Sequence, residues 1–155
     1  MSETKSTDAA EPRKVVAFRI GNQEFCVDIM SVREIRCWTP ATPLPRSPDF
    51  VRGVINLRGF VLPIVDLAAR FGFPPAEPTA QHVIIVTQVG HRTIGLLVDA
   101  VSDILSVTDD LVQPTPYVAS EMAETFVRGV FVIDGRMISV IAPDDVVPAS
   151  ERDAA

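Results

Sequence analysis

The chain contains few of the residues on which catalysis and metal binding usually depend. It has two histidines, His82 and His91, and two cysteines, Cys26 and Cys37. Two histidines cannot build a histidine-rich metal site, and the sequence has no CxxC pair, glycine-rich phosphate loop or Gly-x-Ser-x-Gly motif. We therefore expect no cofactor, no metal and no enzymatic activity. The cysteines are interpreted as small apolar residues that a reducing compartment keeps as thiols.

Charge and aromatic content restrict the class of partner. The net charge is −6, no lysine follows Lys14, and the chain has one tryptophan and one tyrosine. Nucleic-acid binding requires concentrated positive charge, and single strands also require aromatic side chains for stacking. A small-barrel nucleic-acid binder is therefore a disfavoured alternative, and we expect no nucleic-acid partner. The arginines are scattered singly, which suits individual bidentate contacts better than a diffuse electrostatic field.

Long apolar runs are also missing. No stretch approaches the roughly 20 uninterrupted apolar residues that a membrane-spanning helix needs. Residues 1–11 are polar and lack the apolar segment of a secretory signal. We expect a cytoplasmic protein that does not insert into a membrane.

What the sequence does contain is an internal repeat. Residues 15–35 align without a gap on residues 84–104. Each copy then carries the tetrapeptide Phe-Val-Arg-Gly, which begins at Phe50 and again at Phe126. Two separate blocks in the same order, at nearly the same spacing, indicate a tandem duplication.

Each copy predicts short strands rather than long helices. The chain is rich in valine and isoleucine and is interrupted by 13 prolines, so each copy should supply about four or five strands. Asp134-Gly135 is a strong hairpin signal, and short helices are expected over residues 66–72 and from Asp144. A small sheet removes its exposed edges by closing into a barrel. The predicted fold class is all-β, with two tandem five-stranded barrels packed together and short helices that close each unit.

The repeat also predicts the boundaries of these units. Residues 14–148 should form the folded region, with the first barrel over about 14–78 and the second over about 79–148. Residues 1–13 and 149–155 are expected to be disordered tails. Barrels of this size are individually marginal, so the two should pack against each other. The groove between them is then the natural binding site.

A pair of aspartates offers one catalytic alternative. Asp66 and Asp99 each follow an apolar strand pattern, as in a carboxylate dyad contributed by a duplicated barrel. Neither is followed by the Ser/Thr-Gly turn that such a dyad requires, and Asp99 aligns with Met30 rather than with Asp66. A hydrolase of this kind is therefore disfavoured, and it would require the two carboxylates to converge.

Arg58 is an informative difference between the two copies. It lies in the turn Asn-Leu-Arg-Gly, where the second copy has Val-Ile-Asp-Gly with Asp134. Because Asp-Gly is sufficient to make such a turn, the fold does not require an arginine there. Two interpretations stay open, a solvated turn residue and a contact with a partner.

Four segments carry a specific pattern: Val-Arg-Glu-Ile (32–35), Phe-Val-Arg-Gly-Val-Ile-Asn-Leu-Arg-Gly (50–59), Leu-Pro-Ile-Val-Asp-Leu (62–67) and Gly-Leu-Leu-Val-Asp-Ala-Val (95–101). Together they resemble the CheW family, the coupling proteins of bacterial chemotaxis, over about Lys14 to Val147. The resemblance implies two five-stranded SH3-like barrels and a non-catalytic scaffold. Such a scaffold couples the histidine kinase CheA, through its regulatory domain, to the cytoplasmic tips of methyl-accepting chemoreceptors. Recruitment to receptor arrays at the inner membrane, and rings with the kinase or with further CheW copies, are also implied.

The resemblance implies a role for particular residues. Those at the receptor-facing groove are Val32, Glu34, Gly53 and Arg58. Those associated with kinase binding are Val83, Ile84, Gly95 and Val101. The second set is apolar and lies on strands, so a place in the core stays open as its alternative. The chain departs from the family after Asp-Leu, where an arginine is common and this sequence has Ala68, with Arg70 two positions later.

Overall fold

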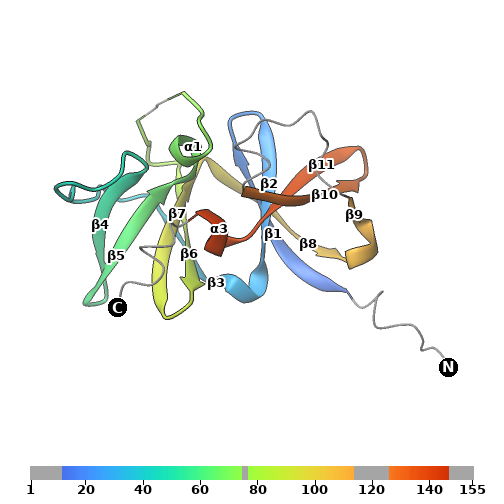
Figure 1. Cartoon of the computed structure of the whole chain (residues 1–155), viewed down its shortest axis with the longest axis horizontal. Coiled ribbons are helices and arrows are strands. Elements are labelled where there is room, and N and C mark those ends of the chain that lie inside the picture. Colours follow the sequence, from blue (N-terminus) through green and yellow to red (C-terminus); the bar gives the residue numbers. More distant parts are fainter. Residues whose placement is uncertain (1–11, 75–76, 114–125, 147–155) are drawn as a thin grey trace.

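The computed structural model describes residues 12–74, 77–113 and 126–146 (Figure 1). This part of the chain is all-β, as predicted, and its eleven strands are β1 (Arg13–Ile20), β2 (Gln23–Asp28), β3 (Val32–Cys37), β4 (Val51–Leu57), β5 (Phe60–Asp66), β6 (Val83–Val89), β7 (Arg92–Val98), β8 (Ala100–Val107), β9 (Val112–Gln113), β10 (Val127–Ile133) and β11 (Arg136–Ile141). Its helical segments are short: η2 (Ile29–Ser31), α1 (Leu67–Arg70), η3 (Asp109–Leu111) and α3 (Pro143–Val146). No helix in the described ranges has the length and apolar character needed to cross a membrane. Of the expected tails, residues 1–11 and 149–155 lie outside the described residues, while Arg13 already belongs to β1.

The strands form two sheets that lie side by side (Figure 1). One has six strands in the order β8-β1-β2-β11-β10-β9, and the other has five in the order β3-β6-β7-β5-β4. In the first, the edge strands β8 and β9 are joined through η3. In the second, Thr42 follows the edge strand β3 and forms a bridge with Val54 of the opposite edge strand β4. Each sheet thus curls round to meet its own edge, and we call the two units the six-stranded barrel and the five-stranded barrel.

The expected division of the barrels near residue 78 does not match the strand pairing. The five-stranded barrel takes β3 to β7, residues 32–98, whereas the six-stranded barrel combines β1 and β2 with β8 to β11. The first hairpin of the first copy, β1 and β2, joins the later strands of the second copy, and the first hairpin of the second copy, β6 and β7, joins the later strands of the first copy. The two copies have thus exchanged their first hairpins. Equivalent parallel pairs make the exchange, β2 with β11 and β7 with β5. The apolar alternation in the sequence shows that a strand is buried but not which strand it pairs with, so the exchange was missed.

Three apolar cores follow from this arrangement. One core lies within each barrel, and a third is shared between them. Strand β1 serves two cores, because Val15 and Ala17 belong to the six-stranded barrel while Val16, Phe18 and Ile20 belong to the shared core. Burial on both faces gives strands with little polar alternation. The shared core joins the two barrels into one unit.

The glycine of the repeated tetrapeptide has the same role in both barrels. A Cβ atom on Gly53 would lie 2.2 Å from the carbonyl oxygen of Thr42, and one on Gly129 would lie 3.0 Å from that of Gln113. Only glycine lets the strand approach the closing segment of its barrel this closely.

The arginine of the tetrapeptide holds the helix that closes each copy. Arg52 Nε donates to Asp66 Oδ2 at 2.9 Å, and Asp66 is the N-cap of α1, as predicted. Arg128 Nε donates to Asp145 Oδ2 at 2.8 Å, inside α3. This second helix begins at Pro143, one residue before the expected start.

Candidate functional site

The structure brings two of the predicted receptor-facing residues into direct contact. Glu34 lies on β3, Arg58 lies in the turn between β4 and β5, and Arg58 Nη2 donates to Glu34 Oε1. Glu34 Oε2 also accepts from Arg36 Nη1 at 3.2 Å. The hydrogen bond from Arg58, with a further one from Arg36, lowers the pKa of Glu34 despite partial desolvation. The same contact with Glu34 raises the pKa of Arg58. At neutral pH this is therefore a charged pair on the surface of the five-stranded barrel.

The backbone at Arg58 supports a role beyond the turn. Arg58 has φ +52°, and the equivalent Asp134 has φ +50°. Aspartate enters this left-handed region more readily than arginine, because its short side chain can bond locally. The backbone conformation of this turn therefore favours aspartate, as at Asp134, over arginine. Arg58, with 65% of its side chain exposed, is not explained by the turn itself.

The other two predicted receptor-facing residues are less exposed than Arg58. Val32 is half-buried and packs against the shared core. Gly53 is buried, and its close approach to Thr42 serves the closure of the five-stranded barrel. Gly53 can influence a partner only through the shape of the barrel, whereas part of the Val32 side chain is accessible.

A groove of about 660 Å³ opens beside the Glu34 and Arg58 pair. Phe60 and Val61 line it with 74% and 72% of their surfaces exposed, and Leu44 is also exposed. The remaining lining residues are Arg33, Val54, Leu57, Leu62, Pro63, Val86, Gln88, His91, Arg92 and Thr93. Exposed apolar side chains gathered beside arginines are typical of a protein-binding surface. The groove lies on the five-stranded barrel, not between the two barrels as the sequence predicted.

Sequence reasoning missed Phe60 and Val61, although a signal was present. They follow the turn glycine Gly59 directly, so they begin a strand at the tip of a hairpin, where side chains are exposed. The second copy has Arg136 and Met137 at the equivalent positions. Of these two pairs, only the first places two adjacent apolar side chains at the hairpin tip.

Two of the predicted kinase-binding residues lie inside the five-stranded barrel. Ile84 is fully buried, and a Cβ atom on Gly95 would lie 2.7 Å from Ile84 Cγ2 and 2.8 Å from Ile64 Cδ1. Val83 and Val101 are half-buried and pack against the shared core. The alternative that this set belongs to the core therefore holds for Ile84 and Gly95.

Equivalent residues of the two barrels explain the glycine at position 95. In the six-stranded barrel its counterpart is Cys26, which is fully buried among smaller neighbours, Val15 and Val140. In the five-stranded barrel the counterparts of these valines are Ile84 and Ile64. Larger neighbours therefore fill the space that a missing side chain leaves, which is how a core keeps its packing density.

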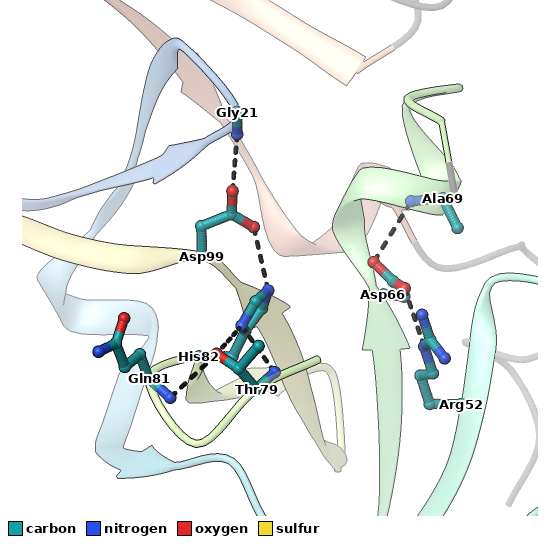
Figure 2. A network of polar contacts seen from close by, with 8 residues as sticks. All are labelled: Gly21, Arg52, Asp66, Ala69, Thr79, Gln81, His82 and Asp99. Atoms are coloured by element: carbon teal, nitrogen blue, oxygen red, sulfur yellow. Dashed lines mark hydrogen bonds and ion pairs between the residues drawn. The ribbon is translucent and has the colours of Figure 1, made fainter. Parts of the chain in front are cut away.

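The two aspartates considered for catalysis are each engaged in a structural network (Figure 2). Asp66 accepts from Arg52 at 2.9 Å, while Asp99 accepts from the Gly21 amide at 2.8 Å and lies 3.4 Å from His82 Nε2. In the view of Figure 2 each carboxylate points to its own partners and not to the other. Among the residues that the structure describes, no group of histidine, cysteine and carboxylate side chains could hold a metal ion. These contacts hold separate segments of the chain together, and the two aspartates do not form a catalytic carboxylate dyad.

Comparisons with known proteins agree with this arrangement. The CheW-like domain model matches residues 14–151 of the chain. The chemotaxis protein CheW of Rhizobium meliloti is 62% identical over 143 residues, which cover 92% of each chain. The chemotaxis protein CheW of Klebsiella aerogenes is 34% identical over 139 residues, which cover 90% of this chain and 84% of that one. Among solved structures, the scaffolding protein TtCheW from Thermoanaerobacter tengcongensis has a TM-score of 0.78 and 31% identity, with 84% of this chain and 89% of that chain covered.

Proposed function

Because this chain belongs to the CheW family of chemotaxis proteins, we propose that it couples the histidine kinase CheA to the cytoplasmic tips of methyl-accepting chemoreceptors. The chain is a non-catalytic chemotaxis scaffold, so its function lies in which partners it holds together. It acts in the cytoplasm, is recruited to receptor arrays at the inner membrane, and joins rings with the kinase or with other copies of itself.

The observation that carries the receptor contact is the Glu34 and Arg58 pair beside the exposed apolar groove. The guanidinium of Arg58 has five N–H donors, of which one reaches Glu34, and the side chain is largely exposed. It can therefore donate to a carboxylate or carbonyl of the receptor tip while it keeps Glu34. Phe60 and Val61 supply the apolar part of the same surface.

The kinase contact needs a surface that the first partner does not occupy. Val83 and Val101 stay in this proposal because part of each side chain is accessible. Ile84 and Gly95 support kinase binding only indirectly, through the close packing of the interior of the five-stranded barrel.

Charge reversal at Arg58 tests the receptor contact. In co-sedimentation with receptor-bearing membranes and CheA, Arg58→Glu should reduce kinase recruitment by about tenfold, the effect of losing one contact worth about 1.4 kcal/mol at the interface. The melting temperature should stay nearly unchanged, because the side chain is exposed. Asp134→Arg is the matched control, since Asp134 is the exposed equivalent of Arg58 at the hairpin turn of the six-stranded barrel and has nearly the same positive φ.

Two further outcomes separate the possible failures. The double variant Glu34→Arg with Arg58→Glu restores the internal ion pair in reversed order. If it also restores recruitment, Arg58 acts through Glu34 and does not contact the receptor. If the wild-type protein itself recruits no kinase to receptor membranes, the proposed function is wrong.

A further inference from the structure

Arg70, at the end of α1, lies where the two copies of the repeat meet. Its guanidinium carbon is 4.2 Å from the ring centre of Phe50 and 4.8 Å from that of Phe126. Its Nε donates to the carbonyl oxygen of Val146 at 2.8 Å. Phe50 and Phe126 are equivalent in the repeat, and Arg70 and Val146 are equivalent too. The contact therefore lies between matching positions of the two copies.

This contact crosses the boundary between the barrels. Arg70 and Phe50 flank β5 and β4 of the five-stranded barrel, whereas Phe126 and Val146 flank β10 and β11 of the six-stranded barrel. Phe71, next to Arg70, also contacts the six-stranded barrel, because its ring centre is 5.2 Å from that of Phe25 and 5.4 Å from that of Phe126. In Figure 1, α3, which ends at Val146, lies between the two barrels.

Arg70 supplies a directional contact at a second place on this boundary, apart from the contacts of Asp99 with Gly21 and His82. The shared core resists separation of the barrels, but burial of apolar surface is non-directional and does not by itself fix an angle. Within the described residues, the chain passes between the barrels at two places, η2 and Asp99. A planar guanidinium that lies over two rings, with one N–H bound to a carbonyl, is satisfied in only a narrow range of orientations.

We propose that Arg70 locks the angle between the two barrels, and that this lock lets a partner bound to one barrel control a partner bound to the other. The second part rests on the proposed function, with the receptor at the groove of the five-stranded barrel and a kinase contact that includes Val101 on β8 of the six-stranded barrel. The first part concerns the isolated protein alone. Arg70 is thus a positioning residue that need not touch either partner.

The lock is tested by an inter-barrel distance distribution from a pair of spin labels. Cysteines introduced at Asn56 and Met137 are exposed, lie on different barrels and can be labelled in a Cys37→Ser background. Arg70→Met should broaden the distribution by about twofold, because, among the contacts described, only the shared apolar core and the Asp99 contacts then restrain the angle. Arg136→Met is the matched control, since Arg136 pairs only within the six-stranded barrel in the contacts described, and it should leave the width unchanged. An unchanged width in Arg70→Met would overturn the lock.

The coupling is tested with both partners. Arg70→Met should bind receptor membranes and CheA separately with affinities close to wild type, while receptor control of kinase activity falls about tenfold. Arg70→Lys, which keeps a cation between the two rings, should recover part of that control. If Arg70→Met fails to fold, Phe50→Leu removes one ring of the stack and should broaden the distance distribution less. Wild-type protein that does not couple its partners would refute the proposed function, whereas the distance measurement would still decide the lock.

Discussion

Substitution of Gly95 by alanine distinguishes a core residue from a kinase contact. The new methyl group would lie 2.7 Å from Ile84 Cγ2, 2.8 Å from Ile64 Cδ1 and 3.4 Å from Leu62 Cδ2. Overpacking of this kind costs about 1–3 kcal/mol. Removal of a strand glycine returns about 0.5–1 kcal/mol, because alanine loses less backbone entropy on folding. The strain is larger, so Gly95→Ala should lower the free energy of unfolding by about 1–2 kcal/mol.

A second substitution shows whether the clash is the cause. Ile64→Val removes Cδ1, one of the two atoms nearest to the added methyl, and alone it should cost about 1 kcal/mol. Combined with Gly95→Ala it should cost less than the sum of the two, by about 1 kcal/mol, because the smaller side chain makes room. Urea unfolding followed by circular dichroism measures all three variants. Additive effects, or a Gly95→Ala protein of wild-type stability that no longer binds CheA, would refute placement in the core.

Two further predictions concern a second glycine and the thiols. Gly53→Ala should lower the free energy of unfolding by on the order of 3 kcal/mol or more, because its Cβ would lie 2.2 Å from a backbone oxygen of Thr42. Gly59→Ala, also at positive φ but with open space around it, should lower it by about 1 kcal/mol. Equal losses of stability in urea unfolding would show that the backbone conformation alone matters. Burial raises the pKa of the Cys26 thiol to about 12, so Cys26 stays protonated at neutral pH, while Cys37 is exposed. A native sample should therefore release about one equivalent of thionitrobenzoate from Ellman's reagent, and a denatured sample about two. Two rapid equivalents from the native protein would contradict the burial of Cys26.

The repeat predicted the elements of the fold well, because each signal is local. The hairpin at Asp134-Gly135 and the N-cap Asp66 act on residues next to them, and both are observed. The exchange of hairpins could not be predicted in the same way. It depends on parallel pairs such as Ile64 with Gly95, between residues that the sequence does not bring together.

The candidate site was predicted in part for a similar reason. The difference between Arg58 and Asp134 pointed to a turn that lines the groove, and the resemblance added Glu34, which accepts a hydrogen bond from Arg58. The sequence alone could not separate an apolar residue in a core from one at an interface, which is why Gly95 stayed ambiguous. The role of Arg70 was also invisible, because an arginine in the last turn of a helix is common for local reasons.

The exchanged hairpins impose an order on folding during synthesis. The five-stranded barrel is built from the continuous segment 32–98, so all of its strands are available once that segment has left the ribosome. The hairpin of β1 and β2 is made first, yet β2 pairs with β11 near the end of the described chain, where Glu24 lies opposite Ile138. The hairpin of β1 and β2 therefore stays incompletely covered until β11 has been made. Strand β2 is thus among the first to be synthesised and among the last to gain its second partner, and a nascent chain interrupted after β7 would carry one complete barrel and one hairpin without β8 and β11 beside it.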